Sequence, residues 1–288
     1  MRLLVLVSVL LGSLFALDVR LTSTQIANGK SALLLLSSKD GKEYTKVKIA
    51  SQSFPLLVHP KDENSFFTLL PMSYYEKPSH KKLHVFYEKD GVQHSQEIAL
   101  DVVQGEYKKE VLEVESSKVT LSDADKKRTA KEYAEAMKIY KTITPKSYIQ
   151  EPFKVPLDSF ITSEFGKARV YNGSLKGYHS GTDFRAEVGV PIIASNDGVV
   201  VLAQERFYAG GSIVIDHGYG IYTTYYHLSK FLVQEGDVVK KSQVIALSGK
   251  SGRVTGPHLH FGVRVFGVQV DPLQFITLIN QNLFKGIQ

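Results

Sequence analysis

Two short patterns in the second half of the sequence contain side chains that could bind a metal ion. In the first, His179 and Asp183 are four positions apart, so both side chains fall on one face whether the backbone is extended or helical. In the second, His258 and His260 alternate with apolar residues, which predicts a strand that directs both imidazoles to one side. Imidazole and carboxylate groups that converge in this way are typical of sites for divalent metals.

A third pattern, Tyr-Tyr-His-Leu-Ser, places His227 at the end of an alternating stretch, where its side chain can face a groove. The sequence has no cysteine, so a metal would have to be bound by His, Asp or Glu. It also lacks the His-Glu-x-x-His pattern that supplies a glutamate base, so an imidazole would have to transfer the proton.

We interpret His217 as a residue that orients the turn at 216–220 and leave it outside the site. Spacing alone does not decide which of His258 and His260 would be a ligand.

The surrounding sequence predicts a mainly β protein in which a helical linker joins two β regions. Residues 17–104 contain short apolar or alternating runs and two Lys-Asp-Gly turns, which indicates a small N-terminal β domain. Residues 105–150 are rich in charge and contain one helix that starts at the capping residue Ser122. Beyond residue 151 lie 17 of the 22 glycines, and the strand-like runs between them predict an antiparallel sheet over residues 151–275. Residues 276–288 are assigned to a C-terminal tail.

Residues 1–16 are predicted to be a secretory signal peptide, which implies a secreted, periplasmic protein. Arg2 supplies a positive start, an apolar run follows to Phe15, and Ala16 could occupy the cleavage position. This run is too short to span a membrane comfortably. An uncleaved N-terminal anchor is the alternative, because Leu14 stands where a small residue is usual. The net charge of +6 would attract the protein to anionic envelope polymers, and a solubilising surface explains the same charge equally well. An exported chain with scattered Lys and Arg is poorly suited to nucleic acid.

Taken together, the three histidine patterns resemble those of the LytM/lysostaphin-type (M23) zinc endopeptidases of peptidoglycan. The resemblance rests on His179-x-x-x-Asp183, on Tyr-His-Leu-Ser at His227 and on Gly-Pro-His-Leu-His-Phe at 256–261. It extends from about residue 161 to about residue 272 and includes the elements Asp-Gly-Val-Val, Asp-His-Gly-Tyr-Gly and Glu-Gly-Asp-Val-Val. It implies that the C-terminal region is an antiparallel β-sheet peptidase domain of this type.

The resemblance also implies a role for each residue of the patterns. His179, Asp183 and His260 would bind Zn²⁺ and leave one coordination position for water, while His227 and His258 would be catalytic histidines that do not bind the metal. Bound zinc would polarise the scissile carbonyl and lower the pKa of its water from ~15.7 toward ~7. We expect His258 to act as the base and His227 to stabilise the oxyanion.

The function implied by the resemblance is zinc-dependent hydrolysis of peptidoglycan during cell-wall remodelling. The protein would cleave stem-peptide cross-links as a DD-endopeptidase, with DD-carboxypeptidase activity as an additional reaction. Its partners would be peptidoglycan stem peptides, with no nucleic acid and no stable membrane span after signal removal. The alternative is a non-catalytic M23-like module that activates another cell-wall hydrolase. The presence of every ligand and of both further histidines favours the enzyme.

Two features near the predicted site lie outside this assignment. The N-terminal domain and the helix are not covered by the resemblance, and we predict that they shade or gate the zinc groove. Arg253 lies in the loop before the last histidine pattern. It could bind a stem-peptide carboxylate, but we interpret it as a solvated loop arginine.

Overall fold

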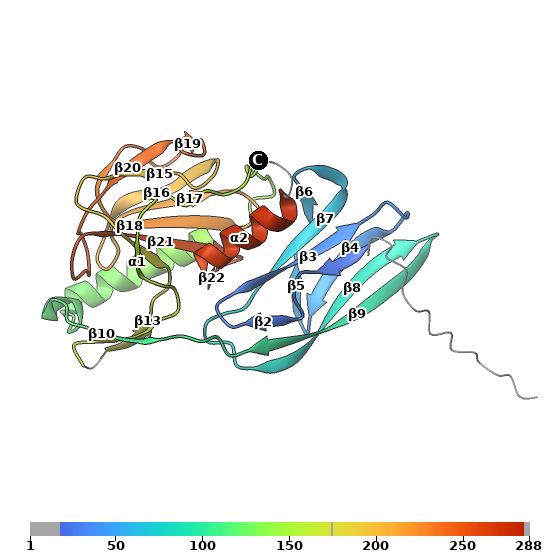
Figure 1. The fold of residues 1–288 in the computed structure, drawn as a ribbon, viewed down its shortest axis with the longest axis horizontal. Helices are drawn as coiled ribbons and strands as arrows, with labels where there is room; N and C mark the ends of the chain where they lie inside the picture. Colours follow the sequence, from blue (N-terminus) through green and yellow to red (C-terminus); the bar gives the residue numbers. More distant parts are fainter. Residues whose placement is uncertain (1–17, 174, 285–288) are drawn as a thin grey trace, which may run out of the picture.

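The computed structural model describes residues 18–173 and 175–284, which form two β regions joined by a linker (Figure 1). The predicted signal peptide, residues 1–16, lies outside the described residues. Within the described part, no helix has the length and apolar character needed to cross a membrane. Strands dominate both regions, so the prediction of a mainly β fold is confirmed.

The N-terminal region is a sandwich of two sheets. One sheet has the strand order β1-β3-β7-β6 and the other the order β2-β9-β8-β4-β5. Asp90 and Gly91 both have positive φ in the turn between β8 and β9, as the Lys-Asp-Gly sequence predicts. Leu34, Val47 and Leu83 are fully buried in a core to which both sheets contribute. The strands are β1 (Val19–Leu21), β2 (Gln25–Ala27), β3 (Ser31–Ser37), β4 (Glu43–Ile49), β5 (Gln52–Phe54), β6 (Leu57–His59), β7 (Asp62–Pro71), β8 (Ser79–Lys89) and β9 (Val92–Val103).

The linker contains a strand in addition to the expected helix. Strand β10 (Lys109–Leu112) pairs in parallel with β12 (Ala168–Tyr171) of the C-terminal region, and a short 3-10 helix, η1 (Ser116–Lys118), follows. A four-residue strand in a charged stretch shows too little alternation to be recognised in the sequence. The strand ties the linker to the C-terminal sheet.

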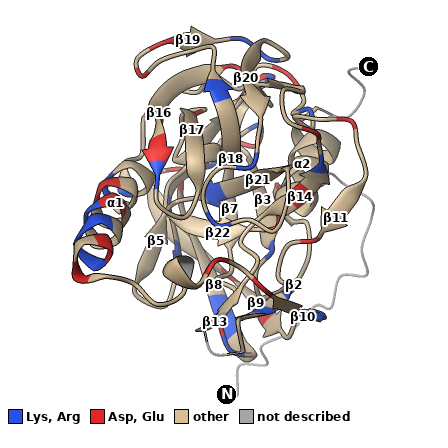
Figure 2. Ribbon diagram, turned by 90° about the vertical axis from the view of Figure 1, so that its left-hand side faces the viewer, with Lys and Arg blue, Asp and Glu red and all other residues tan. Residues whose placement is uncertain are grey.

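Helix α1 (Asp123–Lys141) begins after Ser122, whose hydroxyl accepts a hydrogen bond from the Asp125 amide as a helix cap. Lys and Arg are interspersed with Asp and Glu along this helix (Figure 2). Its inner face buries Tyr140, which contacts Tyr222 with ring centroids 5.7 Å apart. The helix is therefore charged toward solvent and apolar where it covers the C-terminal sheet.

The C-terminal region is built on a 10-stranded sheet whose main path runs β11-β14-β21-β18-β17-β16-β19. Strands β15, β20 and β22 attach to this path, and β10, β12 and β13 form a separate small sheet. Neighbouring strands of the large sheet pair antiparallel, as predicted. The strands are β11 (Ile161–Ser163), β13 (Leu175–Tyr178), β14 (Thr182–Arg185), β15 (Pro191–Ile193), β16 (Gly198–Arg206), β17 (Gly210–Asp216), β18 (Ile221–Phe231), β19 (Val238–Val239), β20 (Val244–Ser248), β21 (His258–Val265) and β22 (Val268–Val270).

Helix α2 (Pro272–Leu283) connects the C-terminal sheet to the N-terminal sandwich. It begins after Asp271, whose carboxylate caps the helix. Phe275 is fully buried in the same core as Leu33 and Phe67 of the sandwich. The apolar core is thus continuous across the junction. The predicted boundary between peptidase domain and tail, after residue 275, falls inside this helix.

This shared core predicts a large stability effect of Phe67→Ala. Phe67, on β7, is 2% exposed. Its truncation leaves a cavity, so we expect the free energy of unfolding measured in urea to fall by about 3–5 kcal/mol. Val58, on the neighbouring strand β6, is 45% exposed, and Val58→Ala should change the same quantity by less than ~0.5 kcal/mol. Equal losses in the two variants would contradict a core that crosses the junction.

Candidate metal centre

Three buried side chains from separate segments of the C-terminal region meet at one point. His179 follows β13, Asp183 lies on β14 and His260 lies on β21, where antiparallel pairing sets Asp183 opposite His260. The Asp183 Oδ1 atom lies 2.8 Å from both His179 Nε2 and His260 Nδ1, and the two nitrogens are 3.0 Å apart. Among the residues that the structure describes, these three form a cluster able to hold a metal ion. The structure thus brings together the three ligands expected from the sequence.

One hydrogen bond fixes the tautomer of the His179 ring, so that its unprotonated nitrogen lies at this cluster. Its Nδ1 lies 2.8 Å from the carbonyl oxygen of Glu164, and because a carbonyl only accepts, that nitrogen carries the proton. In the neutral ring, Nε2 then offers a lone pair beside the Asp183 carboxylate. Burial acts to raise the pKa of Asp183, but when the carboxyl group titrates, the positive charges and donated hydrogen bonds of His179 and His260 in their protonated forms more than offset burial and hold this pKa well below its usual range. The cluster is therefore rich in lone pairs and negative charge, which a bound cation would neutralise.

The second oxygen of Asp183 is held by an arginine that the sequence analysis missed. Arg169, on β12, donates from Nη2 to Asp183 Oδ2 at 3.1 Å and from Nε to Glu110 Oε2 at 2.9 Å. Glu110 lies on the linker strand β10 and also pairs with Lys167 at 3.6 Å. This chain of ion pairs orients the carboxylate and leaves Oδ1 for the cluster. No local pattern signals Arg169 or Glu110, because only the pairing of β10 with β12 brings them to the site.

A second chain of contacts supports the ring of His260. Tyr226 is paired with His260 in the β18–β21 register, and the two rings stack with centroids 5.4 Å apart and planes 5° from parallel. The Tyr226 hydroxyl lies 3.1 Å from the hydroxyl of Tyr140 on α1. The linker helix therefore helps to position one of the three candidate ligands.

His227 and His258 each leave the ring nitrogen Nε2 free on the side of the three-residue cluster. Nδ1 of His227 donates to the Ser251 carbonyl at 2.8 Å, and Nδ1 of His258 donates to the Gly256 carbonyl at 2.9 Å. Each neutral ring therefore carries an unprotonated Nε2, and that of His258 lies 3.7 Å from Asp183 Oδ1. The two ring centroids are 4.7 Å apart. Burial, followed by the neighbouring His258 and His260, lowers the pKa of His227 well below its usual value.

The backbone of His227 has a conformation that few residues with a Cβ atom adopt. Its φ is +63°, in the left-handed region, at an irregularity in the pairing of β18 with its neighbours. The amide of His227 donates to the Ala209 carbonyl at 2.8 Å, and its ring is fixed by Ser251. The kink aims the imidazole at the cluster, which a regular strand would not do at this position.

Two small pockets adjoin these five residues. One, of about 150 Å³, is lined by Asp183, His227 and His258, and also by the linker residues Glu110, Leu112 and Val114. The other, of about 160 Å³, is lined by His179, His227 and His260, and also by Tyr178, Tyr208 and Tyr226. Arg169, Tyr171 and Arg253 line both pockets. Residues of the cluster line each of the two pockets, so both pockets border the candidate metal centre.

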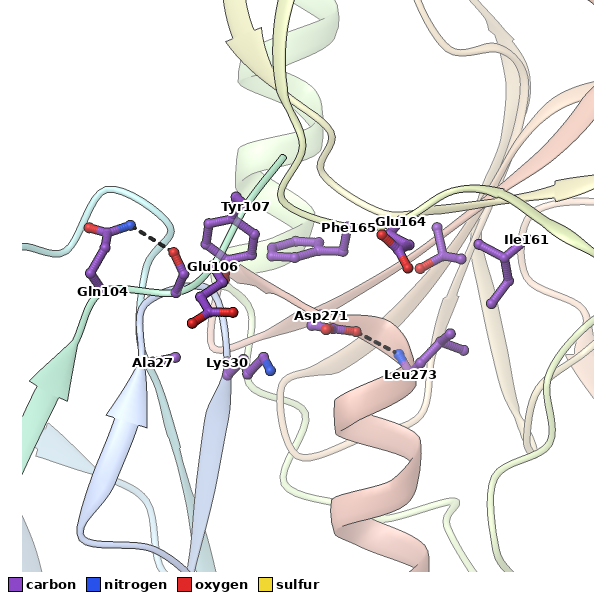
Figure 3. Close-up of a pocket in the computed structure, with 12 residues that line it drawn as sticks. Ala27, Lys30, Gln104, Glu106, Tyr107, Ile161, Glu164, Phe165, Asp271 and Leu273 are labelled. Atoms are coloured by element: carbon purple, nitrogen blue, oxygen red, sulfur yellow. Dashed lines mark hydrogen bonds between the residues drawn. The ribbon is translucent and has the colours of Figure 1, made fainter. Parts of the chain in front are cut away.

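A larger cavity, of about 540 Å³, lies at the junction of the two regions and contains none of the five site residues (Figure 3). Tyr107 of the linker and Phe165 lie next to each other there, with ring centroids 6.2 Å apart and ring planes 72° apart. Glu164, whose carbonyl holds His179, also lines this cavity. The N-terminal sandwich thus reaches the segment that orients one candidate ligand, although the cavity itself lacks the chemistry of the cluster.

His217 belongs neither to the cluster nor to the two pockets, in keeping with its interpretation as a turn residue. It is fully buried; its Nδ1 donates to the Asp197 carbonyl at 2.6 Å and its Nε2 lies 2.8 Å from Thr223 Oγ1. Burial lowers its pKa to about 4. His217 therefore stays neutral in the fold at neutral pH and serves structure.

Comparison with known proteins gives a family for the segment that carries this geometry. Residues 177–272 match the sequence profile described as peptidase family M23. This segment belongs to the M23 family. It contains all five of the site residues expected from the sequence.

Two relatives of the M23 segment are named as DD-peptidases. One is the peptidoglycan DD-endopeptidase ShyA of Vibrio cholerae, 44% identical over 124 residues, a match that covers 42% of this chain and 29% of that protein. Another is the DD-carboxypeptidase/endopeptidase Mpg of Neisseria meningitidis, 41% identical over 95 residues, covering 33% of this chain and 22% of that protein. The matched part is thus less than a third of either relative.

A solved structure shows that the fold extends beyond the M23 segment. A candidate M23 peptidase from Pseudomonas aeruginosa superimposes with a TM-score of 0.65 and 24% identity, covering 88% of this chain and 95% of that one. The similarity includes the N-terminal sandwich as well as the C-terminal sheet, since 88% coverage exceeds either region alone.

The buried state of His217 predicts a specific pH dependence of stability. Its pKa is about 4 in the fold and about 6.5 when unfolded, so between these values the unfolded chain binds more protons and stability falls as the pH falls. His217→Asn removes this contribution. The difference in unfolding free energy between wild type and His217→Asn, measured in urea, should shrink by about 2 kcal/mol from pH 7 to pH 5. A difference that stays constant over this range would contradict the buried, neutral imidazole.

Proposed function

We propose that the protein is a zinc metallopeptidase that hydrolyses peptide cross-links in peptidoglycan. The observation that carries this proposal is the convergence of His179, Asp183 and His260 with the two further histidines His227 and His258. The names of the relatives, a DD-endopeptidase and a DD-carboxypeptidase/endopeptidase, support the substrate class and suggest both activities. A non-catalytic module that activates another hydrolase would have no need of the complete set. The signal-like residues 1–16 support export to the periplasm, where this substrate lies.

The donor set suits zinc. Two imidazole nitrogens and one carboxylate oxygen are the ligand types of open catalytic zinc sites, which keep a fourth position for water. Tetrahedral coordination places ligand atoms roughly 3.3 Å apart. The present separations of 2.8, 3.0 and 2.8 Å are only slightly smaller, so side-chain adjustments of a few tenths of an ångström would suffice. When bound, zinc polarises the scissile carbonyl and makes water acidic enough to attack at neutral pH.

We assign different roles in proton transfer to the two remaining histidines, His258 and His227. His258 offers an unprotonated Nε2 and, once protonated, would pair with the Asp183 carboxylate 3.7 Å away, so we assign it as the base. His227 can donate to a carbonyl oxygen only after it gains a proton at Nε2, and its lowered pKa disfavours this in the resting site. Negative charge developing on the substrate oxygen would favour the protonated ring, so we assign His227 to the oxyanion.

Substitution of single histidines separates the metal ligands from the catalytic residues. We expect His179→Ala to lose both zinc and hydrolysis, because it removes a ligand. His227→Ala should retain zinc and lose about 10²- to 10⁴-fold in turnover. Zinc content is measured by elemental mass spectrometry after gel filtration, and hydrolysis by mass spectrometry of cross-linked muropeptides. Zinc loss in His227→Ala equal to that in His179→Ala would overturn the division of roles.

The linker is well placed to restrict access to the groove. Side chains of Leu112 and Val114 line the pocket beside His258, and the ion pairs of Glu110 with Arg169 and Lys167 fasten this segment to the C-terminal region. We propose that this segment narrows the groove for large cross-linked substrates. A fragment of residues 151–288 would test this poorly, because it also removes β10 and helix α1.

Shortening the side chains that face the groove tests this gating directly. We expect the double variant Leu112→Ala/Val114→Ala to digest intact sacculi several-fold faster than wild type, since it widens the approach without altering the ion pairs. Val111 directly precedes Leu112 and is 68% exposed, so Val111→Ala is the matched control and should be unchanged. Rates are measured as release of soluble muropeptides. An unchanged or lower rate in the double variant would count against gating.

A further inference from the structure

The loop between β20 and β21 is fixed by tight contacts with its neighbours. The Ser251 hydroxyl accepts from the Gly211 amide and donates to the Leu228 carbonyl, both at 2.8 Å. Gly252 has φ of +81°, and a Cβ atom there would lie 2.4 Å from the Gly210 nitrogen and 2.5 Å from the Tyr208 oxygen. Only glycine fits so close to another backbone. The loop is therefore held in one conformation.

Arg253 follows directly in this fixed loop. Its amide donates to the Tyr208 carbonyl at 2.9 Å. Its guanidinium lies over two aromatic rings, with Cζ 4.2 Å from the centroid of Tyr171 and 4.4 Å from that of Tyr208. The side chain is half-buried. Arg253 thus lies in a loop and is partly exposed, as predicted, but its guanidinium also packs against two tyrosines that are distant in the sequence.

The charge of Arg253 has no anionic partner among the described residues. Arg169, the other arginine that lines both pockets, is paired with Glu110 at 2.9 Å and with Asp183 at 3.1 Å. By contrast, no carboxylate of residues 18–173 and 175–284 forms an ion pair with Arg253. A guanidinium is always charged and presents several donors in a rigid plane. Held by its faces and unpaired at its edge, this group is prepared to bind an anion.

The position of Arg253 indicates where that anion would lie. Arg253 lines the pocket that contains Asp183 and His258 and also the pocket that contains His179 and His260. An anion on its guanidinium would therefore lie within the approach to the candidate metal centre. A carboxylate matches the guanidinium fork with two parallel hydrogen bonds.

We propose that Arg253 binds a free carboxylate of the peptide substrate, next to the bond that is cleaved, and thereby selects acidic peptides. This proposal rests on the proposed peptidase function and deepens it by naming a substrate feature. The group is a specificity determinant, because it contacts the substrate away from the reacting atoms. A neutral bridge such as oligoglycine lacks a carboxylate at this place and would gain nothing from Arg253.

The test compares two synthetic cross-linked peptides that differ only in whether the carboxyl group next to the scissile bond is a free acid or an amide. For zinc-loaded wild type, kcat/KM should be about 10- to 100-fold higher for the acid. In Arg253→Gln this preference should disappear, because kcat/KM should fall for the acid peptide and stay unchanged for the amide peptide. Arg253→Lys keeps the charge but not the fork, and should give an intermediate preference.

Arg128→Gln is the matched control. Arg128 also lies over an aromatic ring, 5.7 Å from the centroid of Phe207, and pairs with Glu132, but it lines neither pocket. Its variant should retain the full preference for the acid. Equal losses on acid and amide in Arg253→Gln would indicate a structural role and overturn the proposal.

Calorimetric binding of the two peptides to the zinc-loaded proteins separates this proposal from the proposed function. Wild type should bind the acid more tightly than the amide, and Arg253→Gln should bind both alike. If wild type cleaves neither peptide but shows this difference in binding, the peptidase function fails and the carboxylate site stands. If wild type binds both peptides with equal affinity, the carboxylate site is refuted whatever the turnover.

Discussion

The register between β14 and β21 is the constraint on which the site depends. Antiparallel pairing sets Asp183 opposite His260, and the same register sets Arg185 opposite His258. Because side chains alternate between the two faces of a strand, a shift by one residue would turn Asp183 and His260 to opposite sides. The apolar residues on either side of His260 enforce the register, since Leu259 and Phe261 are fully buried. The same burial that stabilises the sheet therefore assembles the cluster.

The negative charge of a buried carboxylate must be offset by polar or charged partners, and the partners of Asp183 connect the linker to the site. One oxygen faces the two histidines, and the other accepts from Arg169, which in turn pairs with Glu110 of β10. Helix α1 reaches the opposite side of the cluster through Tyr140 and the tyrosine that stacks on His260. The segment between the two β regions is thus part of the site's support, which agrees with a role in controlling access.

The sequence reveals the parts of the site that are local in the chain. Separations of four between His179 and Asp183 and of two between His258 and His260 are visible as patterns, because a short stretch of backbone already orients the side chains. Arg169 escapes such analysis, since its partner Glu110 is 59 positions away and meets it only through a parallel pairing of short strands. The packing of Arg253 escapes such analysis for the same reason, because the tyrosines beside it come from other strands and loops.

The central claim is that one ion binds to His179, Asp183 and His260. Anomalous X-ray diffraction at the zinc absorption edge, from crystals of the zinc-loaded protein, tests it most directly. We expect a strong anomalous peak in contact with His179 Nε2, Asp183 Oδ1 and His260 Nδ1. A peak located instead at the exposed histidines of the N-terminal sandwich, or a crystal without any peak at the cluster, would contradict it.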